Sequence, residues 1–309
     1  MERKKEQEQA RYRWRGICLA LLSTLSFAFM QVFVALTGEE VGIMEQTFFR
    51  NLIGLIVVGI VAHRSHIPFF GERRYQPHLF ARAAAGFLAI VLLFYASRNA
   101  AQADVSILNR MSMFTISAVS AIFLHEKLTK MHIPAMLVAF LGAFIAADPS
   151  FSSAFLPLLA AFGTALCDTV SYPMISYLSG KVNSLTVVMY FCTFSTVLAI
   201  PLMLPTFVWP TGWNLFCLLM IGVFAAIGQI TMTFSYRWAP AGELSIYNQM
   251  AILDSAILGF FFLQEVPSVR TVLGGGMVIL ASVALFLYKQ RDILLHPFPA
   301  FPEGEAPAK

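Results

Sequence analysis

The chain has 309 residues, of which 58% are hydrophobic and only 12% charged, and its mean hydropathy is +0.72. A soluble domain is about half apolar and about a quarter charged, so this composition excludes an ordinary soluble fold. The formal net charge of +4 does not indicate a nucleic-acid partner, because 6 of the 21 basic residues lie in the first fifteen positions. A basic cluster placed before an apolar run is an orientation signal of membrane proteins.

Apolar runs of about the length that crosses a bilayer as a helix repeat along almost the whole chain. The sequence therefore predicts an all-α polytopic membrane protein with ten transmembrane helices. The first run is longer than the core of a secretory signal, so it is expected to be a retained helix. The expected spans are residues 16–36, 44–62, 80–97, 104–124, 132–147, 154–178, 184–204, 214–236, 243–263 and 269–288.

Basic residues are distributed unevenly between the predicted loops. With a cytoplasmic amino terminus, 17 of the 21 basic residues fall on the cytoplasmic side, counting helix ends such as Arg82. Arg98 and Arg270 fall on the opposite side, and Arg50 and Arg110 lie within spans. The positive-inside rule therefore predicts that both termini are cytoplasmic.

A segment of the first half recurs in the second half at a fixed offset of 139 residues. Residues 98–126 align without a gap with residues 237–265, and nine of the 29 aligned positions are identical. The identical polar pairs are Arg98/Arg237, Ser106/Ser245, Asn109/Asn248 and Glu126/Glu265. Each repeat then holds five spans, and because this number is odd the two copies are expected to be inverted in the membrane, as in many secondary transporters.

The repeat divides the chain into four parts. A basic cytoplasmic tail (residues 1–15) precedes the first five-helix repeat (residues 16–147). The second five-helix repeat (residues 154–288) is followed by a proline-rich cytoplasmic tail (residues 289–309), which is expected to be disordered. The four cysteines lie singly in apolar runs, so the sequence predicts neither a metal site nor a disulfide framework, and no cofactor is expected.

Four ionisable residues fall inside the predicted spans, where each charge costs at least about 2.5–3.5 kcal/mol to insert. They are Arg50, Arg110, Asp168 and Asp254. Two interpretations of these charges stay open. Either they pair with one another and hold helices together, or they bind a substrate.

Polar residues at helical spacing favour the substrate interpretation, because they mark one face of a helix. One such face lies in the fourth span and carries Ser106, Arg110, Met113, Ser117 and Ser120. Another lies in the sixth span and carries Thr164, Asp168, Ser171 and Tyr172, directly before Pro173. The candidate substrate-binding residues are Arg110, Asp168, Arg50, Asp254, Asn109, Ser106, Tyr172, Gln229, Asn248 and Tyr247.

Other singled-out residues are expected to have structural roles. Glu126 and Glu265 lie at span ends, where helix-end contacts account for a carboxylate. Gly274, Gly275 and Gly276 favour close helix packing, either within the chain or between two copies, so a homodimer is included among the expected partners.

Three short motifs add a family resemblance: L-H-E-K-L at 124–128, L-Q-E-V-P at 263–267 and F-F-R-N-L at 48–52. Together with the duplication, the chain resembles the drug/metabolite transporter superfamily over residues 16–288, specifically its ten-helix members with two EamA-type domains. The resemblance implies a bacterial inner-membrane carrier with a central cavity lined by the first, third, fourth, sixth, eighth and ninth spans. Small cationic-drug pumps of this superfamily depend on a carboxylate in the first span, and residues 16–36 contain none.

The leading hypothesis is a secondary transporter that moves a zwitterionic metabolite, such as an amino acid or S-adenosylmethionine, through the bilayer by alternating access. A buried arginine can hold its carboxylate and a buried aspartate its ammonium group. The rival cargo is a flat vitamin such as riboflavin, stacked on Tyr172, Tyr236 or Tyr247. A membrane-embedded enzyme or scaffold is the alternative class, but the motifs H-E-x-x-H, G-x-S-x-G and G-x-x-x-x-G-K-S/T are absent.

Overall fold

The computed structural model describes residues 2–37, 41–69, 71–100, 102–124, 129–149, 154–210, 212–264 and 268–295. Helices dominate these residues, and no strand occurs among them. A helix satisfies its own backbone hydrogen bonds, which a segment surrounded by lipid must do. The helices are α1 (Glu2–Leu36), α2 (Ile43–Arg64), η1 (Arg73–Tyr75), α3 (Gln76–Asn99), α4 (Gln102–Arg110), α5 (Ser112–Phe123), α6 (His132–Ala147), α7 (Phe155–Leu178), α8 (Ser184–Met203), η2 (Leu204–Thr206), α9 (Gly212–Trp238), α10 (Ala241–Tyr247), η3 (Asn248–Met250), α11 (Ala251–Leu263) and α12 (Val269–Leu295).

Eight helical stretches among the described residues are long and apolar enough to cross a membrane. Two further apolar stretches, Ile107–Phe123 and His132–Ala146, are shorter. The 16 residues of α6 extend about 24 Å, less than a hydrocarbon core of about 30 Å. The chain is thus an all-α, multi-pass membrane protein, and the predicted count of ten crossings requires both shorter stretches to cross as well.

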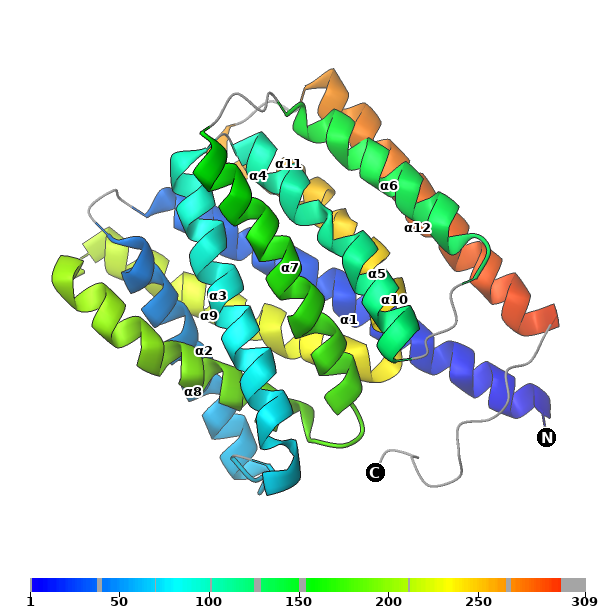
Figure 1. Ribbon diagram of the computed structural model, residues 1–309, viewed down its shortest axis with the longest axis horizontal. Helices are drawn as coiled ribbons and strands as arrows, with labels where there is room; N and C mark the ends of the chain where they lie inside the picture. Colours follow the sequence, from blue (N-terminus) through cyan, green and yellow to red (C-terminus); the bar gives the residue numbers. More distant parts are fainter. Residues whose placement is uncertain are drawn as a thin grey trace.

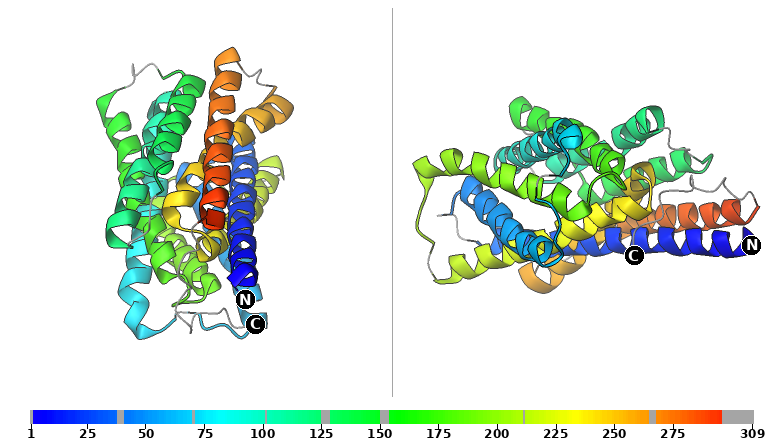
Figure 2. Two further views of the ribbon diagram at one scale, coloured as in Figure 1. Left: turned by 90° about the vertical axis from the view of Figure 1, so that its right-hand side faces the viewer. Right: turned by 90° about the horizontal axis from the view of Figure 1, so that it is seen from below.

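The first and second halves of the chain are interleaved in one bundle. The most extensive helix contacts join α1 with α9, α3 with α7, α2 with α8 and α6 with α12. Figure 1 shows α6 and α12 side by side along one edge of the bundle, with α2 and α8 at the other side. Figure 2 shows that α1 and α12 extend toward the same end of the molecule.

Two spans that the sequence predicts as continuous, 104–124 and 243–263, are interrupted. Met111 separates α4 from α5, and η3 separates α10 from α11. At Met111 the backbone shifts to three-residue bonding, since the Met111 N–H donates to the Leu108 carbonyl (3.2 Å) and the Phe114 N–H to the Met111 carbonyl (3.1 Å). Neither proline nor glycine marks the interruption, so apolar periodicity could not reveal it. Met111 and Met250 are 139 residues apart, the offset of the repeat.

Both ends of the helical bundle extend beyond the predicted spans. The basic segment expected as an amino-terminal tail is helical from Glu2 and continues into α1. Likewise α12 continues to Leu295, so residues 289–295 of the tail expected to be disordered are helical. Extending an existing helix is far less costly than nucleating one, which a composition-based reading overlooks. The rest of that tail, residues 296–309, lies outside the described residues, as do Glu126 and Glu265.

Glycines bring α6 and α12 into backbone contact. A Cβ atom at Gly142 of α6 would lie 2.5 Å from the carbonyl oxygen of Gly274, and one at Gly274 of α12 would lie 2.6 Å from the backbone nitrogen of Ala146. A Cβ at Gly276 would meet nothing within 4 Å. Gly274 therefore serves close packing within one chain, as the sequence allowed.

Candidate functional site

Three charged side chains, Arg50, Arg82 and Asp168, form what we call the charge cluster. They come from the membrane-spanning stretches of α2, α3 and α7. The packing of α3 on α7 places Arg82 where it attracts the Asp168 carboxylate, while Arg82 and Arg50 repel each other. Two positive charges and one negative charge thus share one region of the bundle.

Arg82 is the most deeply buried member of the charge cluster. Only 3% of the residue is exposed, and its Nε and Nη1 atoms are buried without a hydrogen-bond partner. The guanidinium lies over the ring of Phe191 in α8, 4.3 Å from its centroid, which is the geometry of a cation–π interaction. Gly86, one turn further along α3, leaves room for it, because a Cβ there would collide with Nη1 and lie 2.9 Å from Phe191 Cε2. A buried cation with unused donors is costly, and an anionic ligand would offset that cost.

Arg50 is only partly buried, and its protein partners are weak. Its Nε lies 3.4 Å from Met30 Sδ, and its Nη1 lies 3.3 Å from Asn51 Oδ1. Its guanidinium lies 5.9 Å from the centroid of the Phe27 ring in α1. A thioether and one distant amide oxygen leave most of the five donors of this side chain unused. Arg50 is therefore available to a ligand.

Asp168 and Tyr172 lie one turn apart on α7 and are both partly buried. Arg50 and Arg82 both act electrostatically on Tyr172. The Tyr172 ring stacks on Tyr236 of α9, with centroids 6.0 Å apart and planes inclined by 15°. Tyr236 is 3% exposed and belongs to an apolar cluster that also contains Ile116 of α5. The stacked tyrosine rings thus place apolar surface beside the charges.

The members of the charge cluster do not form a closed ion pair. Among the described residues, direct ion pairs join Arg13 with Glu243 and Arg270 with Asp148, and neither includes the cluster. If these charges served to hold helices together, the buried opposite charges should form direct ion pairs, because only direct contact offsets their desolvation. The separation of Asp168 from both arginines therefore favours ligand binding over helix locking.

Arg110 lies elsewhere, at the interruption between α4 and α5. Its Nη1 donates a hydrogen bond of 2.9 Å to Gln249 Oε1, and its Nε is buried without a partner. Gln249 lies 139 residues further on, so the two residues occupy equivalent positions of the repeat. Asn109 and Asn248 flank this contact in sequence and are partly buried. The two interruptions therefore meet through a polar pair, separate from the charge cluster.

The remaining predicted residues are dispersed over other helices. Asp254 of α11 lies beside Thr24 of α1, and its Oδ2 is buried without a hydrogen-bond partner. Gln229 of α9 and Tyr247 of α10 are also buried, with the Gln229 Nε2 and the Tyr247 hydroxyl unpartnered. The side chain of Ser106 lies outside the described part of the structure. The ten predicted residues thus do not form one constellation.

The polar face predicted along the fourth span has another role in its second half. Ser117 is buried, and its hydroxyl lies 3.2 Å from that of Ser245 in α10 and 3.3 Å from His132 Nε2. Ser120 and Met113 are fully buried. These side chains connect α5 with α10 and α6, in keeping with the packing role that serines often have within membranes.

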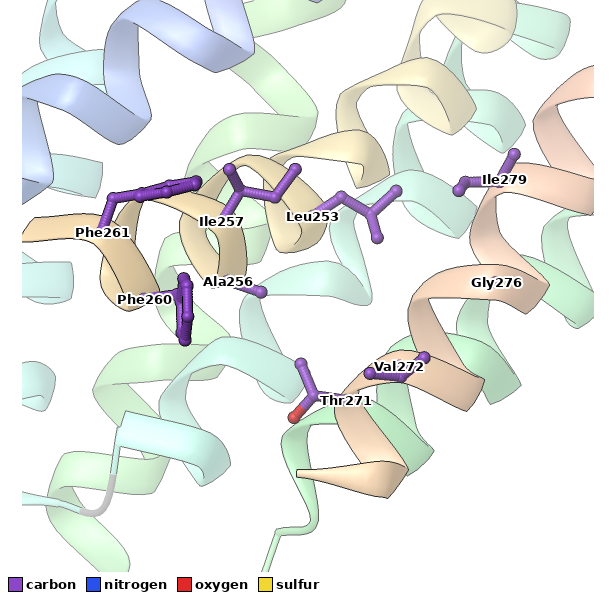
Figure 3. Close-up of a pocket in the computed structure, with 9 residues that line it drawn as sticks. All are labelled: Leu253, Ala256, Ile257, Phe260, Phe261, Thr271, Val272, Gly276 and Ile279. Atoms are coloured by element: carbon purple, nitrogen blue, oxygen red, sulfur yellow. The ribbon is translucent and has the colours of Figure 1, made fainter. Parts of the chain in front are cut away.

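A groove of about 420 Å³ between α11 and α12 contains none of the predicted residues. Figure 3 shows its lining, in which Thr271 is the one side chain with a polar atom and Phe260, Phe261 and Ile257 supply apolar surface. Phe261 is 71% exposed. Such a surface suits lipid chains, and it has no charged group to orient a metabolite, so we do not place the substrate there.

Arg82 is the candidate site residue that the sequence analysis does not select. It lies near the start of the predicted third span, where the charge count treats it as a helix end on the cytoplasmic side. The helix begins at Gln76, four residues before the predicted span, so Arg82 lies nearly two turns inside it. Gly86 one turn later was the available signal, since a small residue leaves space for an arginine folded along its own helix.

Comparison with known proteins agrees with this architecture. The chain belongs to the EamA-like transporter family, whose model matches residues 14–147 and again residues 155–287. It is therefore a transporter of the drug/metabolite superfamily rather than an enzyme, as the resemblance in the sequence predicted.

Individual relatives are carriers of different solutes. The pseudopaline exporter CntI of Pseudomonas aeruginosa is 31% identical over 274 residues, 87% of this chain and 95% of its own. The S-adenosylmethionine uptake transporter of Rickettsia felis is 20% identical over 90% of this chain and 94% of its own. Human solute carrier family 35 member G1 is 23% identical over 86% of this chain and 77% of its own.

A solved crystal structure also shares the fold. It matches 92% of this chain and 98% of its own with a TM-score of 0.77, at 18% sequence identity.

Proposed function

We propose that this protein is a secondary transporter that carries a zwitterionic metabolite across the bacterial cytoplasmic membrane by alternating access. The observation that carries the proposal is the charge cluster, in which arginines and an aspartate share one region without a direct ion pair. A substrate carboxylate at the arginines and a substrate ammonium at Asp168 would satisfy both signs at once.

An arrangement of ten crossings as two inverted five-helix repeats is part of this proposal. In this arrangement each predicted span of the first half matches the span five places later, so α1 matches α7 and α3 matches α9. The contacts then form symmetric sets. The α1–α9 contact corresponds to the α7–α3 contact, and the α2–α8 and α6–α12 contacts each join two matching helices. The interruptions at equivalent positions and the Arg110–Gln249 contact support the same symmetry. Interrupted helices meeting at a repeat interface are a feature of secondary transporters.

We propose that both termini are cytoplasmic. Removing Arg82 from the count leaves the asymmetry of basic residues strong, because the opposite side still holds only Arg98 and Arg270. The relative with 31% identity is named an exporter, which supports export as the working direction. A homodimer remains part of the prediction.

A flat vitamin such as riboflavin is the less favoured cargo. Two of the three tyrosines proposed to stack on it, Tyr236 and Tyr247, are 3% and 4% exposed and already packed. The third, Tyr172, uses one ring face against Tyr236. These three tyrosines thus offer no open pair of ring faces to a flat ligand, whereas the unused donors of Arg82 support an anionic group.

Thermal stabilisation of the purified full-length protein tests the proposal. A ligand that binds the native state raises the apparent stability by mass action, so a panel of amino acids, S-adenosylmethionine, nucleotide sugars and riboflavin should give hits confined to zwitterions. Asp168→Asn should abolish those hits. Liposomes that contain the unmodified protein should show flux of the compound that stabilised it. A hit on riboflavin alone would contradict the proposal.

A further inference from the structure

The charge cluster has an excess of one positive charge. Among the described residues, the one carboxylate that acts on these arginines is that of Asp168, beside Arg82. The other side chains that act electrostatically on Arg50 and Arg82 are Tyr172, a phenol, and Cys192, a thiol. Arg110 and Asp254 are not members of the cluster, since Arg110 bonds to Gln249 and Asp254 lies beside Thr24 of α1. An amino acid with one carboxylate and one ammonium would leave this excess uncompensated.

The excess positive charge is concentrated on Arg82. It is buried, it has unpartnered nitrogens, and it rests on the Phe191 ring. Its guanidinium is held against that ring by the space at Gly86, so its direction is fixed before a ligand arrives. Preorganised arginine donors bind carboxylates in two-pronged geometry and lose little entropy on binding.

We propose that the charge cluster selects a substrate with one amine and at least two carboxylates, an amino-dicarboxylate or a larger amino-polycarboxylate. Arg82 binds one carboxylate, Arg50 binds the other, and Asp168 accepts the ammonium group. This inference rests on the proposed transport of a zwitterion and adds a net negative charge to it. A neutral zwitterion of the same size binds less tightly because one arginine stays buried and uncompensated.

Matched ligand pairs test the inference on the purified full-length protein. L-glutamate is compared with L-glutamine, and L-aspartate with L-asparagine, since each pair differs by one carboxylate at nearly constant shape. We expect the dicarboxylate of a pair to bind at least tenfold more tightly, measured by isothermal titration and by the ligand-dependent rise of Tm. Glutarate, which has two carboxylates but no amine, should bind more weakly than glutamate.

Variants assign the preference to particular side chains. Arg82→Gln should reduce the dicarboxylate preference to less than threefold, whereas Arg64→Gln, an exposed arginine at the end of α2, should leave it intact. Asp168→Asn should allow glutarate to bind as tightly as glutamate, because the acceptor for the amine is lost. Gly86→Ala keeps the charge of Arg82 but displaces its guanidinium, so it should also reduce the preference, and it remains informative if Arg82→Gln does not fold.

The outcomes separate this inference from the transport proposal. Equal binding of glutamate and glutamine, or a preference that survives both Arg82→Gln and Gly86→Ala, would overturn the inference while leaving zwitterion transport standing. Absence of binding by both dicarboxylates would overturn it as well. Binding of riboflavin alone would overturn the inference and the proposed function together.

Discussion

The α6–α12 contact and the charge cluster both join the first half of the chain to the second, but the first is made by glycine backbones and the second by charged side chains. At Gly142 and Gly274 the two backbones touch with no space for a Cβ atom. At Arg50, Arg82 and Asp168 the side chains carry charge and lack a direct ion pair. Close apolar packing fixes two helices relative to each other, whereas unsatisfied charges are stable only with a further partner. The comparison separates the scaffold of the carrier from its candidate site.

The largest effect is expected from filling the glycine contact. Gly274→Val places two methyl groups against the carbonyl of Gly142 and the backbone of Ala146. Because backbone atoms cannot move aside as side chains do, the cost should exceed the roughly 1–3 kcal/mol of ordinary overpacking. We expect this variant not to be recovered as a monodisperse protein in detergent size-exclusion chromatography.

Gly276→Val is the matched control, since it lies half a turn away in the same helix, and a Cβ there meets nothing within 4 Å. It should behave as the unmodified protein. Equal behaviour of the two variants would show that the α6–α12 contact is not a fixed part of the scaffold.

A smaller loss of stability is expected at a charged pair that is closed. Arg13 of α1 donates from Nε to both carboxylate oxygens of Glu243 in α10, at 2.9 and 3.0 Å. Glu243→Gln leaves a largely buried arginine without its anion, which should cost about 3 kcal/mol, at the low end for a buried pair because the Arg13 side chain is 15% exposed. The measurement is the Tm of the purified variant without ligand.

The other direct ion pair of the described residues supplies the control for Glu243→Gln. Arg270 and Asp148 pair at the surface, with both side chains 62% exposed. Exposed pairs contribute little to stability, so Arg270→Gln should change the Tm by no more than a degree or so. If Glu243→Gln also left the Tm unchanged, the presence of a direct ion pair would not distinguish charges with a structural role from charges that bind a ligand.

The sequence could predict the helical bundle because spans in lipid must be long and apolar, and it could predict equivalent halves because identical residues recur at one offset. It could not predict the break at Met111, which arises from a shift in backbone bonding and not from a residue type. Nor could it group the site. Arg50 and Asp168 are 118 positions apart in the sequence, and only the packing of α2, α3 and α7 reveals that they share Arg82 as a neighbour.

The smallest effect on stability is expected for Arg110, which shares features of the scaffold contacts and of the charge cluster. One nitrogen is satisfied by Gln249 at 2.9 Å, as in a scaffold, and Nε has no partner, as in a site. Arg110→Gln removes a charged hydrogen bond but also a buried charge, and these changes oppose each other. We therefore expect a loss of stability below about 1 kcal/mol and an approximately fivefold weaker binding of the transported zwitterion, equivalent to about 1 kcal/mol.

Gln249→Ala distinguishes the two roles of Arg110, because it frees the arginine without removing its charge. If Arg110 acts in binding, the freed guanidinium should keep or improve affinity while the Tm falls slightly. If Arg110 only joins the two interruptions, Arg110→Gln and Gln249→Ala should lower the Tm equally and leave the titration unchanged. That second result would assign the contact between the repeat-equivalent residues to the scaffold and confine substrate recognition to the charge cluster.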